Sequence, residues 1–333
     1  MRVAVYLFGA LGLALLAALL MRSDVGGIVQ ALRVAGWGLL WLVPYRALFF
    51  LLYALGWDAL LRPYNHPRRV GLPYLFWVSS VREAVDRLLP VASVGGSVVG
   101  IRLVRWRGMP TIPACVSVIL EIVLTLVALY AFIAVGLVLL FGSSSGAGSL
   151  DGINYAHLAL AFLCTLPVPV LTALLLRYGS LFSRLQHLLR PLFGDLVPAT
   201  SAGALDIELA AALSRGRNLF AAGALQWLAM MSAAFEVWWV LRIAGHPVSV
   251  VDAVIIESMM QAARHVAFFV PGALGVQEAG LLLAGHALGV GAELALAVSM
   301  AKRLREILCG LPPLISWQWL ELRRLRGGDD RSA

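Results

Sequence analysis

Long apolar runs separated by short polar stretches make up most of the chain. A helix needs roughly 20 mostly apolar residues to cross a bilayer, and six runs reach that length: 3–21, 33–61, 111–141, 153–176, 216–241 and 293–320. The first run is longer than the apolar core of about 7–15 residues in a secretory signal peptide, so we expect it to be retained. The pattern predicts an all-α, polytopic integral membrane protein with about six spanning helices.

Two further apolar stretches, 74–108 and 250–288, are interrupted near the middle by proline and glycine. Proline removes a helical hydrogen-bond donor and glycine loosens the backbone, so each stretch is predicted to form two half-helices around an irregular turn. Irregular backbone persists in a bilayer only where protein or a wet cavity surrounds it. This favours two re-entrant hairpins over the alternative of two proline-kinked spanning helices. The interrupting residues are Pro90, Gly95, Gly96, Pro271, Gly272 and Gly275.

The two halves of the chain share one layout, in repeat units of about 33–141 and 216–320. In each unit a spanning helix leads to a broken stretch and then to a second spanning helix that carries charge in its middle. Three predicted crossings separate the two broken stretches, and an odd number inverts the second unit relative to the first. Inverted repeats with paired broken helices are a recurrent plan of secondary transporters, which bind substrate at the repeat interface.

Composition and charge narrow the class of protein further. Of 333 residues, 61% are hydrophobic and only 13% are charged, whereas soluble domains carry about 25% charged residues; a water-soluble globule is therefore excluded. The net charge of +8 comes from arginines that flank apolar runs, which argues against a nucleic-acid partner. Sixteen of them share one predicted side, namely Arg2 and those of the loop 62–70, of the exit of the first hairpin (Arg102, Arg105 and Arg107), of the connection 177–217 and of the tail 321–333. The positive-inside rule therefore predicts that both termini are cytoplasmic.

Charged side chains also occur where lipid is expected, although each costs about 2.5–3.5 kcal/mol at the bilayer centre. They concentrate beside the two broken stretches, which predicts a hydrated cavity; buried pairs that merely hold the hairpins in place are the alternative. Helical spacing predicts five local pairs, namely Glu83–Arg87, Arg82–Asp86, Gln261–His265, Lys302–Glu306 and Arg303–Glu306. The candidate cavity residues are Arg82, Glu83, Arg87, Glu121, Glu257, Arg264, His265, Gln277, Glu278, Lys302, Arg303 and Glu306.

Two isolated charged residues also lie within predicted spans. Arg46 either snorkels or joins the cavity, and Glu236, beside Trp238 and Trp239, is predicted to be interfacial.

No nucleophile elbow, zinc-protease motif, phosphate-binding glycine loop or paired Asp-rich motif is present. The cysteines have no partners at metal spacing. We therefore expect neither an enzyme nor a metal or other cofactor.

Three strings carry a resemblance to a known family: residues 82–102 (REAVDRLLPVASVGGSVVGIR), 271–280 (PGALGVQEAG) and 302–312 (KRLREILCGLP). They resemble the membrane domain of the lysylphosphatidylglycerol synthase family, and within it the hopanoid-biosynthesis-associated HpnL branch. One departure is Ser97, where an acidic residue is expected after the glycine pair. The matching positions are Pro90, Gly95, Gly96, Arg102, Pro271, Gly275, Gln277, Glu278, Lys302, Arg303 and Glu306.

The resemblance implies a single flippase-like domain over residues 1–320, in a bacterial inner membrane, that moves extended, polar-headed hopanoids. Lysyl transfer is not expected, because the aminoacyl-transferring domain of bifunctional relatives is absent from this sequence. In this hypothesis the head binds in a groove between the hairpins, where Arg82, Gln277, Glu278 and Arg303 offer hydrogen bonds. Glu121 and Glu278 are candidates for proton coupling, because intramembrane carboxylates serve as proton relays.

Other functions stay open at this point. The substrate is a hopanoid in the leading hypothesis, and a phospholipid or another polyprenoid in the nearest alternative. A different class is a non-transporting membrane scaffold, whose partners are hopanoid-tailoring enzymes. An enzyme that modifies hopanoid heads inside the bilayer is the third.

Overall fold

The computed structural model describes residues 25–65, 70–89, 95–143, 202–266, 270, 273 and 275–329. Over these residues the chain is helical and contains no strand, which confirms an all-α, polytopic membrane protein. The predicted spans 3–21 and 153–176 lie outside the described residues, as do most of the connector 177–215 and the residues Pro90, Pro271 and Gly272.

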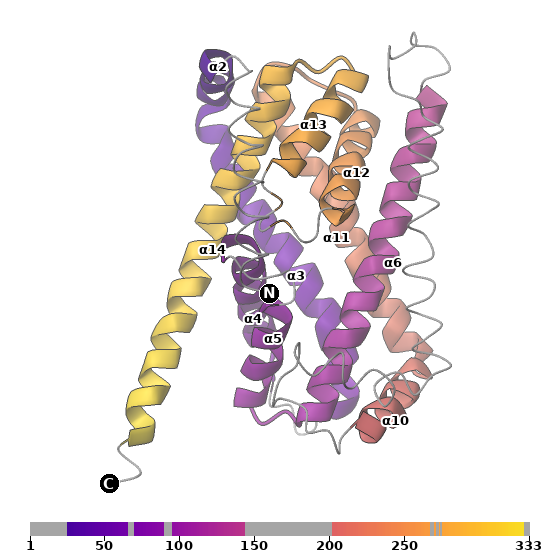
Figure 1. Ribbon diagram of the computed structural model, residues 1–333, viewed down its shortest axis with the longest axis vertical. Coiled ribbons are helices and arrows are strands. Elements are labelled where there is room, and N and C mark those ends of the chain that lie inside the picture. The colour runs from indigo at the N-terminus through magenta and orange to yellow at the C-terminus, as the bar shows by residue number, and fades with distance from the viewer. Residues whose placement is uncertain are drawn as a thin grey trace.

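Four long helices form the frame (Figure 1). They are α3 (Leu42–Leu61), α6 (Thr111–Ser143), α11 (Gly216–Ile243) and α14 (Ala292–Asp329). Shorter elements flank them: α2 (Val25–Ala35) and the 3-10 helix η1 (Gly36–Trp41) before α3, η2 (Arg62–Tyr64) after it, and α10 (Ala202–Leu213) before α11.

Within the described part of the chain, three helical stretches are long and apolar enough to cross a membrane: Leu32–Tyr64, Thr111–Gly142 and Gly216–Ile243. The fourth long helix, α14, has 38 residues and continues past the predicted end at residue 320. Its length suffices for a crossing, but the charged run Lys302–Glu306 in its middle lowers its hydropathy.

Each broken stretch forms a pair of half-helices, as the proline and glycine positions predict. The first pair is α4 (Leu72–Leu88) and α5 (Gly95–Trp106), and the second is α12 (Val250–Val266) and α13 (Val276–Ala287). Leu89, which precedes Pro90, has extended backbone (φ −99°, ψ 146°), because proline disfavours the helical conformation in the residue before it. Gly275 begins α13 at φ 76°, a left-handed conformation that glycine adopts without strain.

Both pairs fold back on themselves. In the first, the Tyr74 hydroxyl near the start of α4 donates a hydrogen bond to the Leu103 carbonyl near the end of α5 (2.7 Å). In the second, Gly280 of α13 lies against Met260 and Ala263 of α12. Figure 1 shows the first pair in the lower half of the molecule and the second in the upper half. They are re-entrant hairpins that approach from opposite ends, and the alternative of kinked spanning helices is wrong.

The two halves run in opposite directions. The equivalent helices α3 and α11 pack antiparallel: Asn218 Nδ2 donates to the Ala59 carbonyl (2.9 Å) at one end, and the Tyr45 hydroxyl donates to the Ser232 carbonyl (2.7 Å) towards the other. The helices α6 and α14 also run in opposite directions (Figure 1). The structure therefore has the layout of an inverted repeat.

Each hairpin packs against the long helix of the other half, α4 against α14 and α12 against α6. A glycine permits close approach in both contacts. A Cβ added to Gly310 of α14 would lie 2.7 Å from Leu88 Cδ1, and one added to Gly136 of α6 would lie 1.7 Å from Ser258 Oγ. The halves are thus interlocked by symmetric, closely spaced helix pairs.

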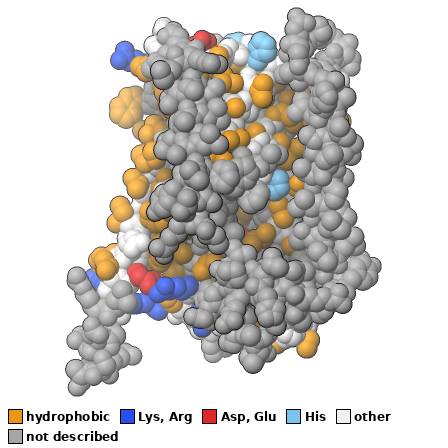
Figure 2. Space-filling model, viewed as in Figure 1, with side chains coloured by type: hydrophobic (Ala, Val, Ile, Leu, Met, Phe, Trp, Pro, Cys, Tyr) orange, Lys and Arg blue, Asp and Glu red, His pale blue; other side chains and the backbone are white. Residues whose placement is uncertain are grey.

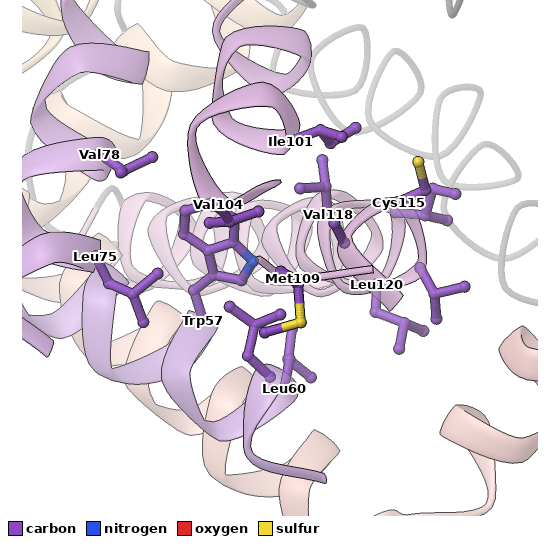
Figure 3. Packing of buried hydrophobic residues seen from close by; sticks show 14 of the residues in the cluster. Trp57, Leu60, Leu75, Val78, Ile101, Val104, Met109, Cys115, Val118 and Leu120 are labelled. Carbon is purple, nitrogen blue, oxygen red and sulfur yellow. The ribbon is translucent and has the colours of Figure 1, made fainter. Parts of the chain in front are cut away.

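Two apolar clusters enclose a polar middle. The larger surrounds Trp57, whose Nε1 donates to Ser117 Oγ (3.0 Å), and is built from α3, α4, α5 and α6 (Figure 3). The other contains Leu42 and Val237 and packs around the second hairpin. Along α3 the order is Leu42, Arg46, Trp57, so the arginine lies between the clusters, and the charged run of α14 is placed likewise. The sequence thus confines its intramembrane charge to one layer.

The close contact of α6 with α12 generates a prediction. We expect Gly136→Ala to destabilise the protein by about 1–3 kcal/mol, because the new methyl group overlaps Ser258. Thermal unfolding in detergent measures the effect. Gly223→Ala on α11 is the matched control: its Cβ would meet only Leu124 Cδ2, at 3.5 Å. Equal midpoints for the two variants would contradict the close contact.

Candidate functional site

A cavity of about 390 Å³ lies where the two hairpins approach each other. Its wall is formed by α3, α4, α6, α11, α12 and α14, together with Ser97 at the start of α5 and with Val270 and Ala273 of the second hairpin's turn. Most of the lining side chains that carry chemistry are charged, and His265 lies among them. The charged ones are Arg46, Arg82, Glu83, Asp86, Arg87, Glu121, Glu236, Glu257, Arg264, Lys302, Arg305 and Glu306.

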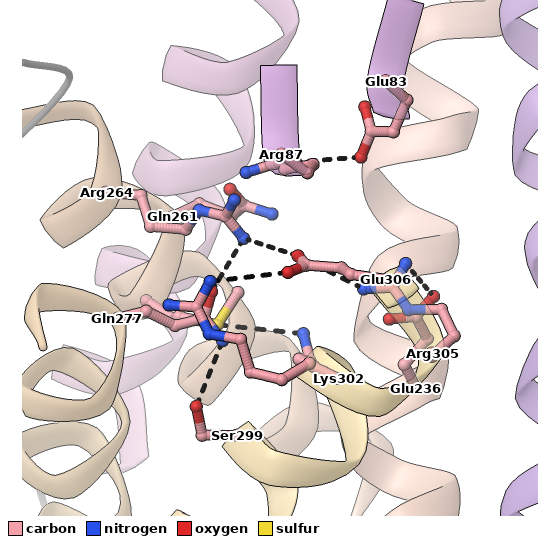
Figure 4. A network of polar contacts seen from close by, with 12 residues as sticks. Glu83, Arg87, Glu236, Gln261, Arg264, Gln277, Ser299, Lys302, Arg305 and Glu306 are labelled. Atoms are coloured by element: carbon pink, nitrogen blue, oxygen red, sulfur yellow. Dashed lines mark hydrogen bonds and ion pairs between the residues drawn. The ribbon is translucent and has the colours of Figure 1, made fainter. Parts of the chain in front are cut away.

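Glu306 is the centre of a network in the second half (Figure 4). Its carboxylate oxygens lie 3.7 Å from Arg264 Nη1, 3.5 Å from Arg303 Nη1 and 3.8 Å from Arg305 Nη2. Arg264 comes from α12 and the two other arginines from α14. One carboxylate is therefore shared by three guanidinium groups, and none of them has it alone.

Glu236 and Arg46 extend this network into the first half. Glu236 Oε1 lies 3.2 Å from Arg305 Nη1 and 3.6 Å from Arg46 Nη1. Arg46 Nη2 donates to Glu83 Oε1 (2.7 Å), which also accepts a hydrogen bond from Arg87 Nε (3.1 Å). A continuous series of ion pairs thus joins α4, α3, α11, α14 and α12 across the interface of the two halves.

In each half one further ion pair joins the first limb of the hairpin to the long helix that follows it, and the signs are reversed between the halves. In the first half, Arg82 Nη1 of α4 donates to Glu121 Oε2 of α6 (2.6 Å). In the second half, Glu257 of α12 accepts from Lys302 of α14 and also from Gln261 Nε2 (2.9 Å). The hairpin supplies the base in one half and the acid in the other.

Gln277 and Glu278 lie behind the cavity wall and are fully buried. Gln277 Oε1 accepts from Arg264 Nη1 (2.9 Å), and Glu278 Oε1 accepts from Ser299 Oγ (2.7 Å) and lies 3.3 Å from Arg303 Nη2. Gln277, Glu278 and Arg303 therefore lie outside the cavity lining, and Gln277 and Arg303 contact the lining residues Arg264 and Glu306. Of the four residues expected to contact the head directly, only Arg82 lines the cavity.

The other predicted site residues line the cavity: Glu83, Arg87, Glu121, Glu257, Arg264, His265, Lys302 and Glu306. The His265 ring lies edge-on to Tyr130, with ring centroids 5.3 Å apart. Gly95 and Gly96 start α5, and Gly275 precedes α13.

The predicted local pairs are partly correct. Glu83–Arg87 (3.1 Å) and Arg303–Glu306 (3.5 Å) are confirmed. The other three are wrong. Arg82 pairs with Glu121 and Lys302 with Glu257, each on another helix, whereas Gln261 donates to Glu257, four residues earlier on its own helix. Spacing along one helix identifies only neighbours on that helix.

Four charged residues outside the predicted site line the cavity, namely Arg46, Asp86, Glu236 and Arg305. Glu236, predicted to be interfacial, is 2% exposed and contacts Arg46 and Arg305, so that prediction is wrong. The antiparallel packing of α3 on α11 brings Glu236 and Arg46 together, which no sequence spacing reveals. A carboxylate within a predicted span was the available signal, because such residues are functional by default. Arg46, which the sequence left open, lines the cavity.

Asp86 explains the departure at Ser97. Its Oδ1 accepts a hydrogen bond from the Gly96 backbone N–H (2.8 Å) at the start of α5. A Cβ on Gly96 would lie 2.4 Å from the Arg82 carbonyl oxygen, so only glycine permits this approach. The acidic group expected after the glycine pair is thus supplied by the other limb of the hairpin.

Comparison with protein families identifies the chain. The family model described as Lysylphosphatidylglycerol synthase TM region matches residues 6–311. The chain belongs to this family. The match covers both hairpins and the charged part of α14, so the cavity lies within the region that defines this membrane family. Comparisons with curated proteins and with solved structures found no match.

The ion-pair series predicts that Glu236 supports the fold of this family member. We expect Glu236→Gln to destabilise the protein by about 3 kcal/mol, because removal of one partner leaves Arg46 and Arg305 incompletely compensated. Thermal unfolding in detergent measures this. Glu293→Gln in the first turn of α14 is the control, since Glu293 does not line the cavity. If both variants unfold like the parent, Glu236 has no role in the network.

Because the two pairs carry opposite signs in the two halves, we expect that exchanging the charges of Glu257 and Lys302 restores the folding that either single change abolishes. Glu257→Lys and Lys302→Glu each place two like charges side by side in a buried site, and we expect either change alone to abolish folding. The double variant restores one charge of each sign, in the order that Arg82 and Glu121 have in the first half. The yield of monodisperse protein on size exclusion is the measurement. If the double variant gave as low a yield as the single variants, the pair would depend on which residue occupies each position and not only on opposite charge.

Proposed function

We propose that the protein is a lipid translocase that moves polar-headed hopanoids, with the polar head in the charged cavity and the fused rings in the surrounding lipid. The observation that carries this proposal is the cavity itself. It contains six basic and six acidic described residues in a chain of which 61% is hydrophobic. A site of this polarity inside a membrane protein marks a substrate pathway.

The size of the cavity supports a head group as its occupant. Ligand sites usually measure about 300–1,000 Å³, so a cavity of about 390 Å³ takes a polyol head but leaves no room for a ring system as well. The rings then remain outside the cavity, in contact with the apolar outer faces of the helices.

The balance of charge argues against an anionic head. Because the basic and acidic lining residues are equal in number, the cavity offers donors and acceptors together and no net attraction for an anion. A phosphate head would need a surplus of arginine or lysine. A polyol head without negative charge therefore fits better than the head of phosphatidylglycerol.

The inverted arrangement supports translocation. The two hairpins approach the cavity from opposite ends, so that movement of one hairpin would open the site to one side and movement of the other to the opposite side. Transporters with inverted repeats alternate access in this way around a fixed central site.

Charge at the molecular surface supports the proposed orientation in a bacterial inner membrane. Figure 2 shows basic side chains at the lower left, beside the end of α14. Arg323 lies over the Trp319 ring (3.6 Å) and Arg324 over the Trp106 ring (4.0 Å), a pairing typical of membrane interfaces. With this end in the cytoplasm the C-terminal tail is cytoplasmic, and the predicted span 3–21 would return the N-terminus to the same side.

Reconstitution into vesicles tests the proposal. We expect the protein to move a fluorescently labelled hopanoid polyol between leaflets and to leave labelled phosphatidylglycerol in place. Arg264→Gln should slow the hopanoid about tenfold or more, because it removes a charged donor that lines the cavity and whose Nη2 has no hydrogen-bond partner among the described residues. Arg33→Gln on α2, outside the cavity, is the control.

The opposite results distinguish the alternatives. Movement of phosphatidylglycerol but not of the hopanoid would replace the proposed substrate with a phospholipid. If neither lipid moves, and deletion of the protein leaves the hopanoid distribution between inner and outer membranes unchanged, translocation is excluded. A requirement for the protein in hopanoid tailoring would then support the scaffold.

A further inference from the structure

Asp86 and Arg264 occupy equivalent positions in the two hairpins. The first limbs, α4 and α12, each contain 17 residues. Asp86 is the third residue from the end of α4, and Arg264 is the third from the end of α12. Both side chains line the cavity. An acid from one half and a base from the other thus enter the same space from hairpins that approach from opposite ends.

Asp86 is the lining acid that has no basic partner. Its Oδ1 accepts the Gly96 N–H, and among the described residues it makes no ion pair. The nearby arginines on its own helix are engaged elsewhere, Arg82 with Glu121 and Arg87 with Glu83. Every other acid in the wall lies within ion-pair distance of an arginine or lysine. Those acids are Glu83, Glu121, Glu236, Glu257 and Glu306.

Arg264 is the lining base that is least compensated. Every other basic residue in the wall has a carboxylate oxygen within 3.2 Å, namely Arg46, Arg82, Arg87, Lys302 and Arg305. The nearest carboxylate to Arg264 is Glu306, at 3.7 Å, and two other arginines share it. The Arg264 side chain is 9% exposed and its Nη2 has no hydrogen-bond partner in the described structure. A buried donor without a partner costs free energy unless a ligand satisfies it.

We propose that Asp86 and Arg264 bind opposite ends of one head group, a primary ammonium at Asp86 and hydroxyl oxygens at Arg264. The inference rests on the proposed function and names the substrate class more narrowly: a polyol head that carries an amine. The remaining lining charges neutralise one another, so these two residues are the groups left to recognise a head. A hydroxyl at Asp86 makes a hydrogen bond in which only the carboxylate is charged, whereas an ammonium makes one in which donor and acceptor are both charged.

Two hopanoids that differ in one group provide the test. One carries a terminal hydroxyl on its polyol head, and the other a terminal amine in the same place. In vesicles with limiting amounts of each, we expect the parent protein to move the amine form about five- to tenfold faster. Asp86→Asn should reduce this ratio to about one. The asparagine retains an oxygen for the Gly96 N–H, so the start of α5 is preserved.

Further variants separate recognition from folding. Asp86→Glu keeps the charge and should retain part of the preference. Arg264→Gln should slow both forms by a similar factor, because both carry hydroxyl oxygens. Asp252→Asn is the matched control for Asp86→Asn: Asp252 is in the first turn of α12, away from the cavity, and accepts a hydrogen bond from Ser249 Oγ. Stabilisation of detergent-solubilised protein by each lipid, measured as a shift in unfolding temperature, provides a readout that does not depend on transport.

The outcomes distinguish this inference from the proposed function. Equal rates for the two forms in the parent protein would overturn the role of Asp86 and leave translocation intact, as would an Asp86→Asn variant that slows both forms equally. Failure of the parent to move either form would overturn the proposed function itself.

Discussion

The structure depends on the requirement that a charge inside a membrane have its partner within the protein. The ion pairs that run from Glu83 through Arg46, Glu236 and Arg305 to Glu306 meet this requirement with side chains from both halves. No single helix supplies both signs in the necessary places. The halves must therefore associate before the charges are compensated, and the network specifies how they associate.

Such a network is poorly explained by stability alone. Replacing a buried ion pair with well-packed apolar residues is often neutral or stabilising by about 1–4 kcal/mol, whereas removing one partner costs about 3–5 kcal/mol. An apolar layer between the two clusters around Trp57 and Leu42 would thus hold the halves together at least as well. The charged layer instead surrounds a cavity, and a function for that cavity explains why polar residues occupy the layer.

The sequence predicts the elements better than it predicts their partners. Apolar length identifies the spanning helices, and proline with glycine identifies the half-helices, because both signals depend on the local backbone. Partners such as Arg82 and Glu121 belong to different helices, and Lys302 reaches Glu257 across the gap between α14 and α12. Helical spacing contains no information on such contacts. Glu236 was misplaced for the same reason, since tryptophans next to it in sequence indicated an interface, whereas its contacts come from α3 and α14.

The opposite charges that the two hairpins present make the two ends of the cavity chemically different. If both halves carried the same charges, a head could bind in either of two orientations related by the internal symmetry. Here the first hairpin presents Asp86 and the second presents Arg264, while the flanking pairs reverse their signs as well. The total charge of the cavity remains balanced, but its two ends differ. Under the proposed function, a head with one cationic end would bind in a single orientation, with its amine towards the first hairpin, whichever side of the membrane the cavity faces.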